Sequence, residues 1–105
     1  MDESLVVKVL LDEKIGVTAE TEEEGRIIEE IAERNGLMWR DGERIFKKVG
    51  RWGCYGAGTI YVFENSISYP KRAVQVIPGY VHDITRNKLM KFDELMIILS
   101  FEGDD

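Results

Sequence analysis

Four glycines lie within residues 50–58, near the middle of the chain, and Trp52, Cys54 and Tyr55 stand between them. Glycine lets a backbone approach another molecule closely, and large aromatic side chains supply contact area. Basic side chains border the same segment: Lys47, Lys48 and Arg51. We therefore predict a contact surface in which Trp52 and Tyr55 anchor a partner. The alternative is that both aromatic side chains only cover the edge of a sheet.

The glycine-rich segment also resembles the loops that bind phosphate at the start of a helix. Here the glycines precede Thr59–Phe63, which reads as a strand, and no Gly-Lys-Ser or Gly-Lys-Thr sequence follows them. A flexible or bulged loop that enters a strand is the favoured interpretation. The alternative function is a small-ligand or nucleotide-binding domain in which the Gly50–Gly58 loop lines a pocket, at a dimer interface in one version. Three tyrosines would complete that pocket: Tyr61, Tyr69 and Tyr80.

Catalytic and metal chemistry find little support in the sequence. Adjacent residues such as His82 and Asp83 rarely pair in the geometry that an acid–base catalyst needs, and Cys54 is far from both in the chain. One histidine and one cysteine are too few for a transition-metal site, and the glutamates of residues 20–24 lack the spacing of a calcium loop. We predict a protein that is not an enzyme, with no catalytic residue, cofactor or metal.

The second candidate surface is a set of glutamates on one predicted helix, expected to form an exposed acidic row: Glu22, Glu23, Glu29, Glu30 and Glu33. Such a row can imitate the phosphates of a nucleic acid and occupy a basic groove on another protein. Arg26 and Arg34 on the same helix dilute its charge. The alternative is therefore a plain solvated helix face.

Composition narrows the class of partner. Against 14 basic residues stand 20 acidic ones, which gives a net charge of −6 and argues against direct binding to nucleic acid. A protein partner with a basic surface fits better, and so small a domain is also compatible with a homodimer. The single cysteine excludes an internal disulfide, and no apolar run approaches the roughly 18 residues of a membrane span. The first residues are acidic, unlike a secretory signal, so we predict a cytoplasmic protein.

Secondary structure is most clearly indicated in the first half of the chain. Residues Leu5–Leu11 form an apolar run typical of a strand, and the alternation within Ile15–Ala19 predicts a second strand. Thr21 and Glu24 have the spacing of a capping box, so a helix is predicted from Glu22 to a stop at Asn35-Gly36. Beyond it we expect a short extended piece, with Trp39 in the core under Ile28 and Ile31, and a turn at Asp41-Gly42. Residues 43–49 fit a helical turn or a loop.

The second half predicts more strands. Thr59–Phe63 and a return strand beginning at Ile67 would form a hairpin around a turn at Glu64-Asn65-Ser66. Ala73–Ile77 is a further strand, ended by Pro78-Gly79. For Phe92–Leu99 the periodicity fits a short helix or a last strand, and we favour a helix capped by Asp93. Residues 1–105 are thus predicted to be one α+β domain, a mainly antiparallel sheet with one principal helix on one face and a frayed acidic end at 102–105.

The stretch from Thr21 to Gly42 resembles a pattern common in small phage and prophage proteins. It combines an acidic helix start at residues 22–24, a stop at Asn35-Gly36, Trp39 and a glycine turn, although Asp41 stands where that pattern often has serine. Later parts are similar too: the hairpin around Asn65 and the closing Phe92-Asp93-Glu94-Leu95. The resemblance implies an accessory protein of the host cytoplasm without a known reaction. It raises the hypothesis of an inhibitor of a nucleic-acid-handling or defence enzyme, as anti-CRISPR proteins are.

Overall fold

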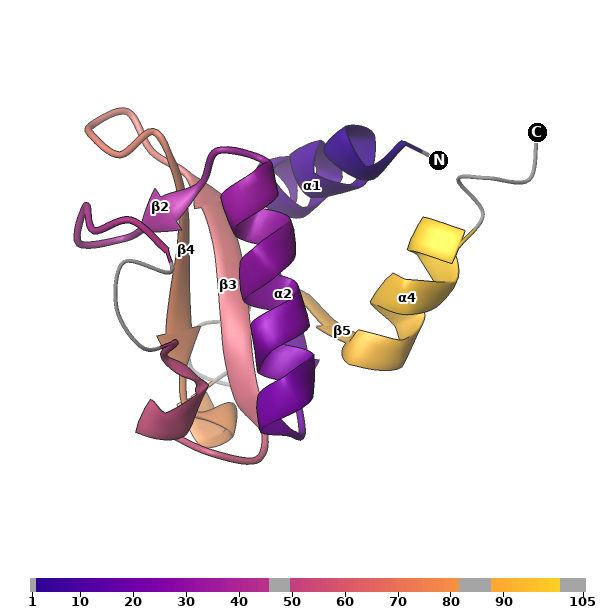
Figure 1. Ribbon diagram of the computed structural model, residues 1–105. Coiled ribbons are helices and arrows are strands. Elements are labelled where there is room, and N and C mark those ends of the chain that lie inside the picture. Colours follow the sequence, from indigo (N-terminus) through magenta and orange to yellow (C-terminus); the bar gives the residue numbers. More distant parts are fainter. Residues whose placement is uncertain (1, 46–49, 82–87, 101–105) are drawn as a thin grey trace.

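The computed structural model describes residues 2–45, 50–81 and 88–100. Within them it contains three α-helices and a sheet of five strands, so the predicted α+β class is confirmed (Figure 1). The helices are α1 (Glu3–Asp12), α2 (Glu22–Arg34) and α4 (Phe92–Ser100). The strands are β1 (Ile15–Ala19), β2 (Met38–Trp39), β3 (Thr59–Asn65), β4 (Arg72–Ile77) and β5 (Lys88–Lys91). Two short 3₁₀ helices accompany them: η1 (Trp52–Cys54) and η2 (Gly79–Val81).

The sheet is mixed, and the prediction of a mainly antiparallel sheet was wrong. The strand order is β2-β4-β3-β1-β5. The three central strands pair antiparallel, whereas each outer strand pairs parallel with its neighbour: β5 with β1 and β2 with β4. Parallel neighbours cannot be joined by a tight turn and need a long connection. Here the long stretches of chain between β1 and β5 and between β2 and β4 provide these connections. The central strand is therefore β3, and it has a neighbouring strand on each side.

The first element is a helix, not the strand predicted over Leu5–Leu11. Its buried side chains fall at helical spacing: Val6, Val7, Leu10 and Leu11. The Asp2 carboxylate accepts a hydrogen bond from the Ser4 backbone N–H at 3.2 Å and caps the helix start. A short apolar run fits a buried strand or a buried helix equally well, and packing decided between them. The structure therefore has more helix than the sequence predicted.

The helix predicted from Glu22 is confirmed as α2. The Thr21 hydroxyl oxygen accepts a hydrogen bond from Glu24 N at 3.1 Å, and the Glu24 carboxylate accepts one from Glu20 N at 2.9 Å. At the other end Gly36 takes a positive φ of 78°, which stops the helix. The predicted turn at Asp41-Gly42 is present as well, with φ 92° at Gly42.

A hairpin is present, but the predicted return strand from Ile67 and the predicted turn at Glu64-Asn65-Ser66 were wrong, because β3 pairs with β4, which was predicted as a separate strand. β3 continues to Asn65, and the return strand begins at Arg72 rather than Ile67. Residues 66–71 connect the strands and are closed by a hydrogen bond from Ser66 N to Lys71 O at 2.8 Å. Serine, proline and a solvent-exposed Ile67 keep this segment out of the sheet. Ala73–Ile77 is confirmed as strand.

The final segment is the helix α4, as favoured. It begins at Phe92, so Asp93 lies in its first turn and is not the cap. Glu94 instead reaches back and accepts a hydrogen bond from Lys91 N at 2.8 Å. Residues 46–49 of the ambiguous segment, and the acidic end at 102–105, lie outside the described residues.

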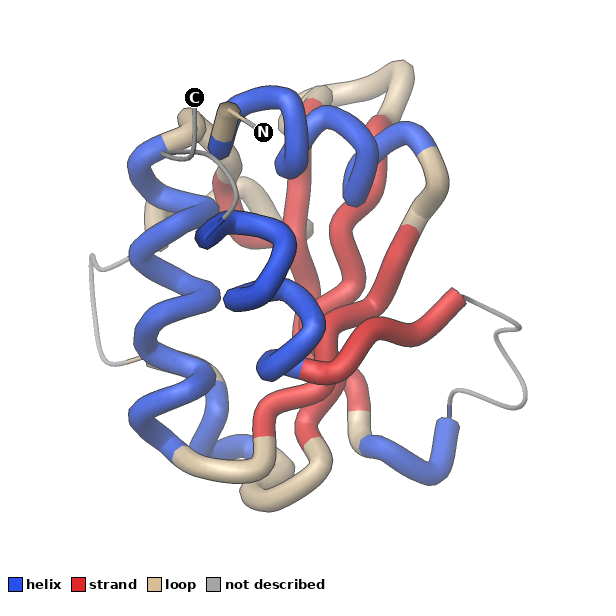
Figure 2. Tube along the Cα trace, turned by 90° about the vertical axis from the view of Figure 1, so that its right-hand side faces the viewer, coloured by secondary structure: helices blue, strands red, loops and turns tan. Residues whose placement is uncertain are grey.

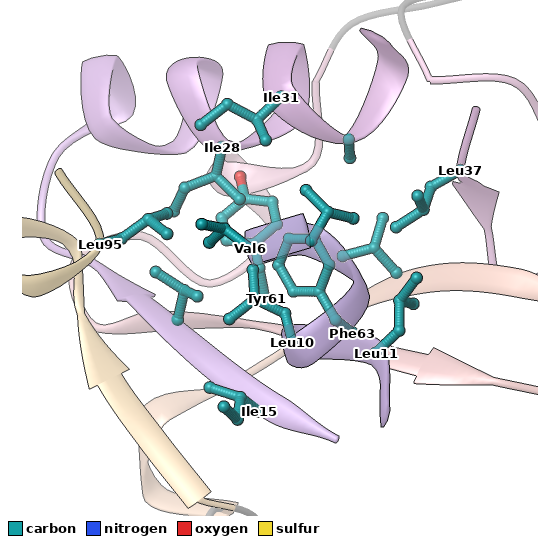
Figure 3. Packing of buried hydrophobic residues seen from close by; sticks show 14 of the residues in the cluster. Val6, Leu10, Leu11, Ile15, Ile28, Ile31, Leu37, Tyr61, Phe63 and Leu95 are labelled. Atoms are coloured by element: carbon teal, nitrogen blue, oxygen red, sulfur yellow. The ribbon is translucent and has the colours of Figure 1, made fainter. Parts of the chain in front are cut away.

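One hydrophobic cluster joins the helices to one face of the sheet. In Figure 2 the three α-helices lie on one side of the strands, and in Figure 3 side chains of α1, α2 and α4 converge on those of the sheet. Alternate strand residues supply the sheet side, among them Val17, Tyr61 and Phe63, all at 0% exposure. Trp39 belongs to the same cluster, as predicted, and is 3% exposed.

Candidate functional site

The glycine-rich segment is tied down rather than flexible. Its 3₁₀ helix η1 contacts α2. The Trp52 indole N–H donates to the Ala19 carbonyl at 3.1 Å, and Gly58 N donates to the same carbonyl at 3.1 Å. Arg51 N donates to Oε2 of Glu29 at 3.0 Å. These hydrogen bonds join the segment to the end of β1 and to α2.

Two features of this segment require glycine. Gly56 and Gly58 take φ values of 74° and 87°, which only glycine adopts without strain. Gly50 lies directly against Glu29, because a Cβ at Gly50 would stand 2.4 Å from Glu29 Oε1. The glycines therefore shape a turn into β3 and let the backbone approach a buried carboxylate; they do not open a helix as phosphate-binding loops do.

Glu29 is buried, at 2% exposure, and is not part of an exposed acidic row as predicted. Besides the Arg51 amide, its Oε2 accepts a hydrogen bond from the Tyr61 hydroxyl at 2.7 Å. Burial, and then this hydrogen bond to a carboxylate, raise the pKa of Tyr61. The sequence held a signal for this: Gly25, Glu29 and Ala32 share the buried face of α2 with Ile28. Nothing in the sequence singled out Tyr61 as the partner.

The other glutamates of α2 do lie on the surface, but ion pairs divide them. Arg26 pairs with Glu23 and, at 3.7 Å, with Glu30. Glu33 is part-buried and pairs with Arg44 at 2.9 Å. Glu22 forms no ion pair with any described residue and stands at the helix start, where α2 is most acidic. Thus the acidic surface narrows to the first turn of the helix.

A groove of about 510 Å³ runs between that first turn and the glycine-rich segment. Its size falls in the range of ligand sites in proteins, about 300–1,000 Å³. Part-buried Trp52 forms one wall, while its indole N–H is held by Ala19. The residues that line it are Glu22, Glu23, Arg26, Glu29, Gly50, Trp52 and Gly53. The groove thus contains residues of both predicted surfaces, the glycine-rich segment and the acidic helix, which appear as separate candidates in the sequence.

Among the described residues, the predicted contact residues Arg51 and Tyr55 do not line this groove. Arg51 turns away, pairs with Asp41 at 2.9 Å and stacks its guanidinium over the Trp39 ring at 4.5 Å. Tyr55 is 49% exposed and lines a separate depression with Arg51 and Cys54, whose thiol is free and exposed. Other candidates lie outside the described residues: Lys47, Lys48, His82 and Asp83.

The pocket of three tyrosines predicted for a small ligand does not form. Tyr61 is fully buried, with its hydroxyl on Glu29. Tyr69 and Tyr80 are 75% and 82% exposed, and the Tyr69 hydroxyl contacts Met38 Sδ at the far edge of the sheet. Since the three side chains have such different surroundings, they line no common pocket, and that part of the alternative function was wrong.

The wall of the groove depends on a small residue in α2. Replacing Gly25 with alanine should lower the free energy of unfolding by about 1–2 kcal/mol. The new Cβ would lie 2.7 Å from the Tyr61 hydroxyl and 2.9 Å from Trp52 Cδ1. Contacts this short place the cost of overpacking in the upper part of its usual range, about 2–3 kcal/mol, and the ~1 kcal/mol that alanine gains in a helix leaves a net loss of about 1–2 kcal/mol. Urea unfolding measures this. Gly53→Ala, with open space around its Cβ, is the control and should change stability by less than about 0.5 kcal/mol; equal effects would contradict the close packing.

No known protein family, curated protein or solved structure gives a significant match to the chain. Of the helices in the described ranges, none is long and apolar enough to cross a membrane.

Proposed function

We propose that this protein binds a partner protein through a basic part of the partner's surface, and that it does so without catalysing a reaction. The observation that carries the proposal is the groove beside α2, where part-buried Trp52 faces the acidic first turn of the helix. An aromatic wall supplies contact area for an anchor residue, and carboxylates at the rim select a positively charged one. The net charge of −6 favours approach to a basic surface as well.

The resemblance to small phage and prophage proteins suggests which protein the partner is. We propose that the basic surface belongs to an enzyme that handles nucleic acid in the host cytoplasm, and that this protein inhibits the enzyme. The acidic rim at the first turn of α2, where Glu22 forms no ion pair with any described residue, would then take the place of phosphates. Because the rim is short, shape at the groove must add to charge, and Trp52 provides that shape.

Charge reversal at the rim tests the proposal. Glu22→Lys should weaken binding to the captured partner at least about tenfold, because it places a cation where the partner's basic residue must sit. Glu22 is exposed and forms no ion pair with any described residue, so the fold should tolerate the change. The partner is first captured from lysate of the native host with the wild-type protein, and its affinity for each variant is then measured by calorimetry at low and high salt.

The matched control is Glu13→Lys, which makes the same charge change at the other end of β1. Glu13 is exposed, and among the residues that the structure describes it pairs only with Lys88, at 2.5 Å, another exposed side chain. This control should retain the wild-type affinity. Equal affinity of both variants, or an affinity that does not fall as salt rises, would contradict binding through the acidic rim.

A further inference from the structure

Only one of the two oxygens of the Glu29 carboxylate accepts a hydrogen bond from the described part of the chain. Both of its hydrogen bonds, from the Tyr61 hydroxyl and from Arg51 N, end on Oε2. No hydrogen bond from any described residue reaches Oε1. An oxygen that is buried without a donor costs about 1–3 kcal/mol, so its surroundings matter.

Oε1 opens into the groove. Among the described residues no fully buried side-chain oxygen or nitrogen lacks a hydrogen-bond partner, so Oε1 must be reached by solvent. Glu29 is only 2% exposed, and it is one of the residues that line the groove. Gly50 lies against this oxygen and has no side chain to cover it. The inner end of the groove is therefore a carboxylate oxygen that can accept a hydrogen bond.

The groove suits a flat cation that donates several hydrogen bonds. Its lining includes the Trp52 side chain and the carboxylates of Glu29 and Glu22. Arg26 lines it too, and its guanidinium is paired with Glu23 and Glu30. A guanidinium group stacks on aromatic rings and donates in its own plane, and it is less strongly hydrated than an ammonium group. An arginine side chain therefore fits these features better than a lysine.

The same protein already contains such an arrangement. The Arg51 guanidinium lies over the Trp39 ring at 4.5 Å and pairs with Asp41 at 2.9 Å. There an indole face and a carboxylate together hold one arginine within the chain. Trp52 and Glu29 present the same two groups to the groove, where no arginine of the described chain stacks on the indole ring.

We propose that the groove binds the guanidinium group of an arginine side chain, with Oε1 of Glu29 as the acceptor at its inner end. The inference rests on the proposed function, and it names the residue by which the partner protein is anchored. A free guanidino compound shares this chemistry. It would bring its own charged groups to the acidic rim, and so the two sources are separable by titration.

The probe is arginine blocked at both ends, as N-acetyl-arginine N-methylamide, added to ¹⁵N-labelled protein. Binding should shift the Trp52 indole N–H signal saturably, while the signal of Trp39, the other tryptophan, serves as an internal reference in the core. The equally blocked citrulline has the same length without the charge and should bind at least about tenfold more weakly. Free L-arginine adds an α-ammonium and an α-carboxylate group whose charges oppose each other at the acidic rim, so it should bind no better than the blocked form. Much tighter binding of the free amino acid would indicate a small guanidino ligand and overturn the assignment to a protein side chain.

Glu29→Gln is the matched variant. The two donors on Oε2 require an acceptor, so the glutamine carbonyl should take that position and turn its NH₂ group toward the groove. The inner end then donates rather than accepts, and blocked arginine should bind at least about tenfold more weakly. Equal binding of blocked arginine and blocked citrulline by the wild type, or undiminished arginine binding by a folded Glu29→Gln protein, would overturn the inference.

The two proposals fail in different ways. If Glu22→Lys loses the partner and Glu29→Gln does not, the protein binds a basic surface but not through an arginine on Glu29. If Glu22→Lys keeps full affinity for the partner, the proposed function itself is wrong, whatever the titration with blocked arginine shows.

Discussion

Replacing Tyr61 with alanine should lower the free energy of unfolding by about 4 kcal/mol or more. Tyr61 is fully buried on the central strand β3, and removal of a large buried aromatic side chain costs about 3–5 kcal/mol. Loss of its hydroxyl also removes one of the two donors to the buried Glu29 carboxylate, which costs about 1–3 kcal/mol more. Domains of this kind are stable by about 5–15 kcal/mol, so a loss of this size is a large part of the total free energy of unfolding.

The comparison with Tyr61→Phe separates the two contributions. Phenylalanine keeps the ring in the core and loses only the hydroxyl, so its cost should be about 1–3 kcal/mol. Urea unfolding followed by tryptophan fluorescence measures both variants. If Tyr61→Phe is as stable as the wild type, the hydrogen bond to Glu29 contributes nothing, and Glu29 is held in place by the Arg51 amide and packing alone.

Replacing Leu11 with alanine should cost about 2–5 kcal/mol, whereas Leu5→Ala should change stability by less than about 0.5 kcal/mol. Leu11 is 3% exposed and lies in the core, whereas Leu5 is 53% exposed on the other side of α1. The pair distinguishes a helix from a strand, because Leu5 and Leu11 would share one face of a strand. Both alanines fit a helix, so propensity does not separate them.

Thermal and urea unfolding of the two leucine variants give the result directly. Similar losses for both would indicate that residues 5–11 form a strand, contrary to the structure. A large loss at Leu11 alone would confirm that α1 contributes one helical face to the core. The same measurement at exposed Val9 should resemble that at Leu5, since both lie on the outer side of the helix.

The link between core and groove has a consequence for function. Glu29 joins Tyr61 of the central strand to the backbone of the glycine-rich segment, so the inner end of the groove is fixed by the core. A site held by a buried network is preorganised and loses little freedom on binding. We therefore expect that variants at Tyr61 which remain folded also weaken binding in the groove, whereas variants at Leu5 do not.

The sequence by itself determined the elements whose signals are local. The capping residues Thr21 and Glu24 and the stop at Gly36 lie within or next to α2, and their contacts span only a few residues. The β-branched and aromatic residues of β3 likewise fit a buried strand whatever lies beside it. For these elements the local free energies and the final fold agree, and the pattern was sufficient.

Only the tertiary structure decided the rest, because the deciding contacts join residues far apart in the chain. The apolar run of α1 fits a helix or a strand, and packing against β1 and β3 selected the helix. In the sequence, Glu29 is not distinguishable from the surface glutamates beside it. In the fold, Tyr61, 32 residues later, and the Arg51 amide, 22 residues later, donate hydrogen bonds to its carboxylate. The acidic helix and the glycine-rich segment therefore appear as separate surfaces in the sequence. In the fold they line one groove, because the buried carboxylate of Glu29 on the helix accepts a hydrogen bond from the backbone of the glycine-rich segment.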